Sequence, residues 1–65
     1  MITIDLSGPD GNAFALMEYA RKFAKQLDLD PTPIVEEMMS ANNYDNVLEI
    51  FENHFGDYVE LERWN

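Results

Sequence analysis

The alternation of apolar and polar residues predicts a short strand at each end of the sequence. Residues 2–6 (ITIDL) alternate with a period of two, and three of the five are β-branched, as is typical of a half-buried strand. Residues 58–62 (YVELE) alternate in the same way. This second pattern predicts a strand with Val59 and Leu61 facing inward.

Three segments between these strands have helical periodicity. The clearest spans residues 13–27, where apolar side chains recur three and four positions apart and form one stripe. The stripe consists of Ala13, Leu16, Met17, Ala20, Phe23, Ala24 and Leu27. The preceding residues 7–12 (SGPDGN) are turn-forming types, so Asp10 or Asn12 can cap the first turn of this helix.

Prolines separate the first helix from the second. Because the residue before a proline is pushed out of the helical region, residues 28–33 (DLDPTP) end the first helix. We expect the second helix to begin with Thr32 as its N-cap and Pro33 at its first position, and to end near residues 41–43.

The third helix is predicted over residues 44–55, with Gly56 closing it in the left-handed conformation. Together these elements predict an α+β fold in β-α-α-α-β order, as a single domain over residues 1–65. The two terminal strands are expected to pair against the helices. The pattern leaves open whether they run parallel or antiparallel.

Length and composition narrow the class of protein. At 65 residues the chain has room for one domain with a thin core, which suggests support from a partner or a second copy. It has no cysteine, which excludes disulfides and thiolate zinc sites. No apolar run approaches the roughly 20 residues of a membrane span, and the N-terminus lacks the features of a signal peptide. We therefore expect a cytoplasmic protein.

The charge is both large and uneven. Thirteen acidic residues against four basic ones give a formal net charge of -9, which disfavours direct binding to nucleic acid or to a membrane. Ten carboxylates and no lysine or arginine lie between residues 26 and 62, whereas residues 12–28 carry three basic and two acidic side chains. We therefore expect two surfaces of opposite charge.

A row of carboxylates on the predicted third helix is the first candidate binding surface. Asp45, Glu49 and Glu52 are spaced four and three residues apart, so they share one arc of the helix, where like charges repel. In one interpretation these residues, together with Glu60 and Glu62, imitate nucleic-acid phosphates and bind a basic surface of another protein. The alternative interpretation is a solvated surface that only maintains solubility.

Phe14 and Tyr58 are candidate aromatic anchors for such a contact. Phe14 breaks the apolar pattern of the first helix, because it falls on the polar side between Arg21 and Lys25. It is either an exposed hot-spot residue or a residue covered by the glycine-rich loop or the C-terminal strand.

A second candidate site lies on the basic side of the first helix. Tyr19, Arg21, Lys22 and Lys25 combine an aromatic ring with three cations, a composition suited to an anionic ligand. They lead to an alternative function, a dimeric sponge that sequesters a nucleotide signal.

Catalysis is not expected. His54 is the only histidine, and it lies within the apolar arc of the third helix near its end, where partial burial and the helix dipole explain it. Residues 5–12 (DLSGPDGN) lack both the ligand spacing of an EF-hand and the lysine of a phosphate-binding loop. We interpret them as a turn and helix cap, and predict no metal and no cofactor.

Two stretches resemble small accessory proteins encoded by tailed bacteriophages: residues 4–14 (IDLSGPDGNAF) and residues 51–59 (FENHFGDYV). The resemblance implies a phage protein acting in the host cytoplasm, and small acidic phage proteins frequently bind a host protein. The leading hypothesis is therefore a non-enzymatic inhibitor of a host protein of the defence or nucleic-acid machinery.

A third hypothesis is a dimeric structural or assembly accessory. The edges of a two-stranded sheet invite another strand, so we expect a homodimer through residues 2–6 or 58–62. Asp5, Glu60 and Glu62 are charges that discourage such pairing, so the sequence leaves this open.

Overall fold

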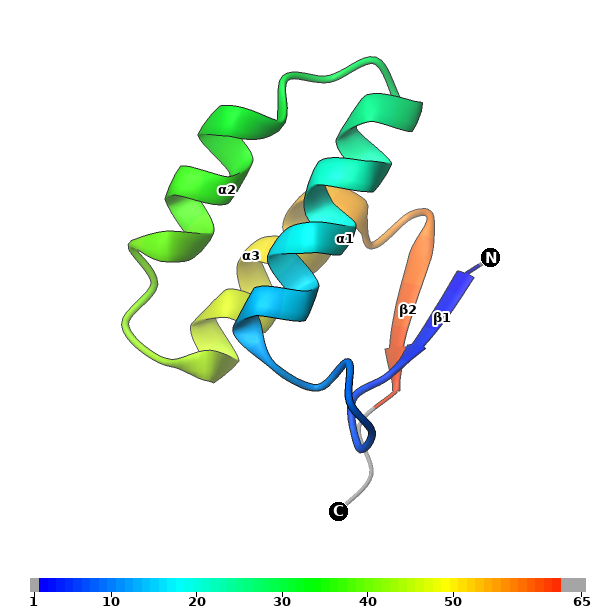
Figure 1. Ribbon diagram of the computed structural model, residues 1–65, viewed down its shortest axis with the longest axis vertical. Helices are drawn as coiled ribbons and strands as arrows, with labels where there is room; N and C mark the ends of the chain where they lie inside the picture. The colour runs from blue at the N-terminus through cyan, green and yellow to red at the C-terminus, as the bar shows by residue number, and fades with distance from the viewer. Residues whose placement is uncertain (1, 63–65) are drawn as a thin grey trace.

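The computed structural model describes residues 2–62 of the 65-residue chain. The elements follow one another in the predicted β-α-α-α-β order, which confirms a small α+β fold (Figure 1). They are β1 (Ile2–Asp5), α1 (Ala13–Gln26), α2 (Pro31–Met39), α3 (Tyr44–Phe55) and β2 (Val59–Glu62).

The two strands pair in parallel, which decides the question that the sequence left open. Ile2 lies opposite Val59 and Ile4 opposite Leu61. The amide of Ile2 donates to the carbonyl oxygen of Tyr58 at 3.2 Å, and that of Leu6 to the carbonyl oxygen of Glu62 at 2.9 Å. Parallel strands need a long crossover, which the three helices supply here.

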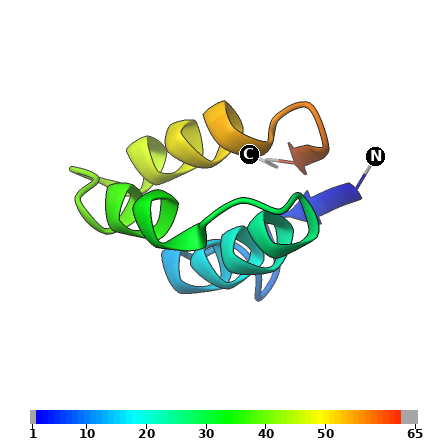
Figure 2. The same cartoon turned by 90° about the horizontal axis from the view of Figure 1, so that it is seen from above.

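The helices and the sheet surround one apolar core. In Figures 1 and 2, α1 and α3 lie on opposite sides of the molecule, α2 lies beside both, and the strands close the remaining side. Three phenylalanine rings meet in the centre: Phe51 lies 5.1 Å from Phe55 and 6.3 Å from Phe23, measured between ring centroids. The predicted stripe of α1 is confirmed, since Leu16, Ala20, Phe23 and Ala24 are buried.

The first helix begins as the sequence predicts, and the second does not. The Oδ1 of Asn12 accepts from the amide of Ala15 at 2.8 Å, so Asn12 is the N-cap of α1. For α2, however, the N-cap is Asp30, whose side chain accepts from the amide of Thr32 at 3.0 Å. The prediction of Thr32 as cap was wrong because Pro31 already holds Asp30 in the extended conformation that an N-cap requires.

The predicted left-handed cap at Gly56 is also wrong. Gly56 has φ -59° and ψ -24°, in the right-handed region, because the chain continues turning until the amide of Tyr58 donates to the carbonyl oxygen of Phe55 at 2.9 Å. The residue with positive φ among those described is Asp28, at 60°, directly after α1. The residue in the left-handed conformation therefore follows α1 rather than α3.

Candidate functional site

The carboxylates of α3 lie on the flank of that helix that is turned away from α2. Asp45, Glu49 and Glu52 are all exposed. The Nε2 of His54 lies 2.8 Å from the Oε1 of Glu37, which identifies the flank of α3 that is turned toward α2. Because successive residues are about 100° apart around a helix, the three carboxylates fall on the other flank.

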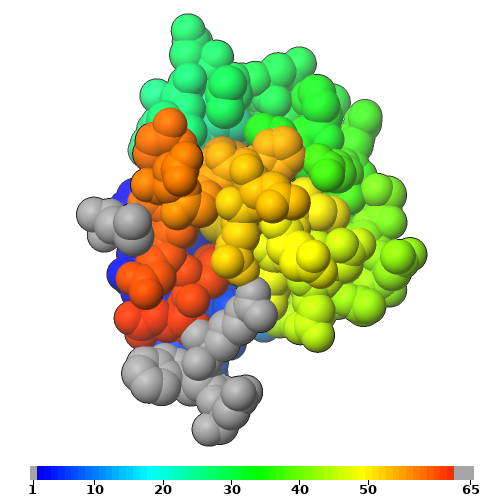
Figure 3. Space-filling model, turned by 180° about the vertical axis from the view of Figure 1, so that it is seen from behind, coloured from blue at the N-terminus to red at the C-terminus, as the bar shows by residue number. Residues whose placement is uncertain are grey.

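Strand β2 adjoins this flank and continues the negative charge. Val59 is buried and Leu61 packs against the core, so Glu60 and Glu62 project from the opposite face of the sheet. Figure 3 shows α3 and β2 side by side on the surface seen from behind. The structure therefore brings the five predicted residues onto two adjoining elements. We call this surface the acidic face: Asp45, Glu49, Glu52, Glu60 and Glu62.

The basic side chains lie elsewhere. Within residues 2–62, every lysine and arginine belongs to α1, namely Arg21, Lys22 and Lys25. Figure 2 shows α1 and α3 on opposite sides of the molecule. The negative potential of the acidic face is therefore not offset by a nearby lysine or arginine among residues 2–62. The uneven distribution of charge along the sequence thus corresponds to separate surfaces, with carboxylates on α3 and β2 and basic side chains on α1.

The two predicted aromatic anchors are far apart. Phe14 is 80% exposed, so neither the loop nor the strand covers it, but it lies on α1, away from the acidic face. Tyr58 is 52% exposed and lies in the turn that joins α3 to β2. Of the two, Tyr58 is the aromatic residue that the structure places beside the acidic face.

The four residues proposed for an anionic ligand do not converge. The hydroxyl of Tyr19 donates to the Oδ2 of Asp10 at 3.0 Å, and the Nζ of Lys22 lies 5.9 Å from the centroid of the Tyr19 ring. This pair lines a shallow hollow with Asp10, Ala15 and Glu18. Arg21 instead pairs with Glu18, Nη1 to Oε1 at 2.8 Å, and lines a separate hollow between α1 and α2.

The Asp10 contact predicts a late titration of Tyr19. Asp10 raises the pKa of the Tyr19 hydroxyl above the ordinary 10.0, chiefly by accepting its hydrogen bond, then because the hydroxyl is desolvated and the carboxylate repels the phenolate. A raised folded-state pKa stabilises the fold below the unfolded-state pKa, and this contribution is lost as the pH rises through the folded-state value. Ultraviolet titration should show Tyr19 ionising above the ordinary pKa of 10.0. The variant Asp10→Asn should lower the pKa of Tyr19, and identical titration curves for wild type and variant would contradict this contact.

Sequence reasoning missed the contact of His54. The side chain is 33% exposed, in keeping with the predicted partial burial near the helix end, but it also bridges α3 to Glu37 of α2. The two residues are 17 positions apart, and no spacing rule relates side chains on different helices. An exposed glutamate on a neighbouring helix leaves no local signal in the sequence.

None of the helices formed by residues 2–62 combines the length and apolar character that crossing a membrane requires. In the same part of the chain, no three histidine or acidic side chains are grouped so that they could hold a metal ion. Comparison of the chain with protein families, with curated proteins and with solved structures found no match.

Proposed function

We propose that this protein is a non-enzymatic accessory protein that binds a basic surface of a host protein through the acidic face and inhibits it. The observation that supports this most is the separation of charge: five carboxylates on α3 and β2, with every described lysine and arginine on α1. The resemblance to phage accessory proteins fits a host partner from the defence or nucleic-acid machinery.

Electrostatic repulsion within the acidic face supports binding over mere solubility. Asp45 and Glu49 are four residues apart on α3, an arrangement that costs about 0.2–0.5 kcal/mol. A surface that only kept the protein in solution could alternate its charges at no cost. A basic partner would relieve this repulsion on binding.

The geometry also suits a surface that imitates nucleic acid. A row of carboxylates along a helix presents regularly spaced negative charge to arginine and lysine side chains, which bind carboxylates and phosphates alike. Such complementarity speeds association and makes it sensitive to salt. Tyr58, at the margin of the acidic face, adds an exposed aromatic residue of the kind that is enriched in binding hot spots.

The alternative of a nucleotide sponge has less geometric support. The hollow beside Tyr19 contains two carboxylates, Asp10 and Glu18, against the single ammonium of Lys22, so it would repel a phosphate. The hydroxyl of Tyr19 is already donated to Asp10. Arg21 opens onto the other hollow, beside Glu36.

The proposal is tested by affinity capture from host lysate with three baits: wild type, Glu49→Lys on the acidic face, and Glu36→Lys on α2 as a control with the same change in charge. We expect a basic host protein to be captured by wild type and by the control and to be lost with Glu49→Lys. If the captured host protein binds nucleic acid, that binding should decline as the wild-type protein is added. Equal capture by all three baits would refute the proposed role of the acidic face.

A further inference from the structure

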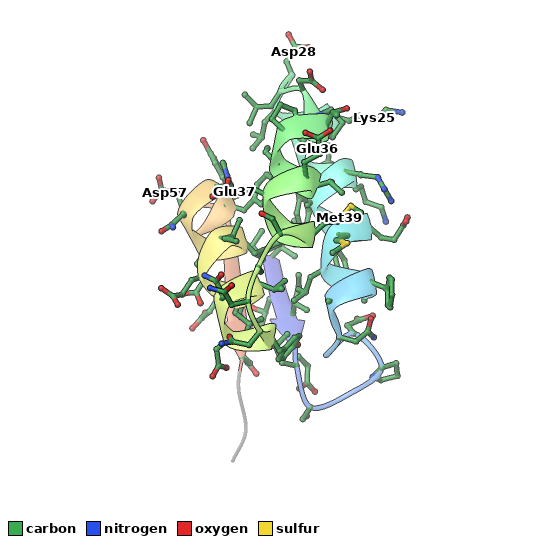
Figure 4. The ribbon with its side chains drawn as sticks, turned by 90° about the vertical axis from the view of Figure 1, so that its left-hand side faces the viewer. Lys25, Asp28, Glu36, Glu37, Met39 and Asp57 are labelled. Atoms are coloured by element: carbon green, nitrogen blue, oxygen red, sulfur yellow. The ribbon has the colours of Figure 1, made fainter. Side chains whose placement is uncertain are left out.

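The exposed side of α1 carries a regular row of side chains that the acidic face does not use. Phe14, Glu18, Arg21 and Lys25 are spaced four, three and four residues apart, so they form one line along the helix, which we call the α1 stripe. Phe14 is 80% exposed, and the side chains of Glu18 and Arg21 are 75% and 54% exposed. Figure 4 shows Lys25 pointing outward from the same helix.

This spacing is that of the contact seam between two paired helices, where residues recur alternately at three and four positions. If two copies of α1 pack antiparallel about a two-fold axis at the centre of the stripe, residues equally far from the axis face one another. Glu18 then faces Arg21 of the second copy. Phe14 faces Lys25 of the second copy.

Each of these pairs is chemically complementary. A carboxylate and a guanidinium form a charge-assisted pair of hydrogen bonds, and an ammonium is attracted to the face of an aromatic ring. The two-fold axis produces each pair twice, so all four layers of the seam are favourable. Read from either end, each residue of the α1 stripe is complementary to the residue at the mirrored position. The α1 stripe is therefore suited to pairing with a second copy of itself.

The distribution of charge restricts where a second copy can approach. A chain with a net charge of -9 repels its own copy, and the acidic face is the least favourable surface for contact. Helix α1 is the one described element with a net positive charge, carrying Arg21, Lys22 and Lys25 against Glu18. Two copies can therefore meet along α1 with the least repulsion.

Apolar surface beside the stripe adds contact area. The hollow between α1 and α2 is lined by Arg21, Val35 and Met39, together with Pro31, Thr32 and Glu36. Met39 is 68% exposed and lies on the part of α2 near α1 (Figure 4). In such an interface the exposed Met39 and Phe14 would bury apolar surface, and the flexible methionine side chain can adapt its shape to the facing copy.

We propose that the protein forms a two-fold symmetric dimer in which α1 packs antiparallel against α1 of a second copy. The sequence pattern instead suggests a dimer through the strand edges, so the two interfaces are different surfaces. Dimerisation through α1 does not depend on the proposed binding of a host protein. In such a dimer the two acidic faces point away from each other, so each copy keeps its acidic face open to a partner (Figure 2).

Two single charge reversals test the pairing. Glu18→Arg places arginine against Arg21 of the second copy, and Arg21→Glu places glutamate against Glu18 of the second copy. Sedimentation equilibrium over a concentration series should show wild type approaching twice the 7.5 kDa of the chain, with each variant monomeric alone. An equimolar mixture of the two variants should regain the dimer mass, because arginine then faces glutamate in both layers formed by positions 18 and 21, and the Phe14–Lys25 layers are unchanged. Circular dichroism verifies that each variant keeps its helices.

Glu49→Arg on α3 serves as the matched control and should dimerise like wild type. A monomeric wild type at every concentration would overturn the proposal. So would a dimer that survives both single reversals, since the interface would then lie on another surface, such as a strand edge. Two variants that stay monomeric when mixed would also contradict the antiparallel register.

Discussion

Replacing Phe51 with alanine is expected to lower the free energy of unfolding by about 3–5 kcal/mol. The side chain is fully buried and its ring lies 5.1 Å from that of Phe55 and 6.3 Å from that of Phe23. A domain of this size has only about 5 kcal/mol of stability, so the cavity would remove most of it. Urea denaturation followed by circular dichroism measures the loss.

The same substitution at Phe14 provides the matched control. Phe14 is 80% exposed, and its loss should change the free energy of unfolding by less than about 0.5 kcal/mol at protein concentrations low enough to keep the chain monomeric. If the two phenylalanine variants were equally destabilised, the helices would not pack as described.

Reversing the charge at Glu49 is expected to weaken binding of a basic partner without destabilising the fold. Glu49→Lys should weaken the complex with a basic partner at least about tenfold, or about 1.4 kcal/mol, because the new charge opposes the partner's arginines and lysines. The free protein should be as stable as wild type, or more stable by about 0.2–0.5 kcal/mol. The introduced lysine lies four residues after Asp45 and three before Glu52, so attraction replaces repulsion on α3.

Binding and stability are thus expected to change in opposite directions. Titration calorimetry with the captured partner gives the first quantity, and thermal denaturation gives the second. Glu49→Gln, which removes the charge without reversing it, should fall between wild type and Glu49→Lys in affinity. A variant that lost both binding and stability would show that Glu49 supports the fold instead.

The sequence predicts the helices well because their signals are local. The buried apolar side of α1 and the bounds of α3 follow from periodicity within one segment. Asn12 likewise caps a helix that begins at the next residue. The start of α2 was misplaced because two prolines, Pro31 and Pro33, each fit the first position of a helix. The parallel direction of the strands depends on how three helices pack between them, which no local pattern contains.

The same distinction between local and tertiary features applies to the candidate site. The row of Asp45, Glu49 and Glu52 is visible in the sequence because it lies within one helix. Its junction with β2, and the separation of Phe14 from Tyr58, are properties of the tertiary arrangement. The pairing of His54 with Glu37 joins two helices and was likewise beyond sequence reasoning.

We infer that the acidic face binds a basic partner mainly through its charge. The dissociation constant of that complex, measured across a salt series for wild type and for Glu49→Lys, tests this inference. We predict that the affinity of wild type falls steeply as salt increases, and that Glu49→Lys binds more weakly with a shallower dependence on salt. An affinity that is the same for both proteins and does not change with salt would contradict the claim.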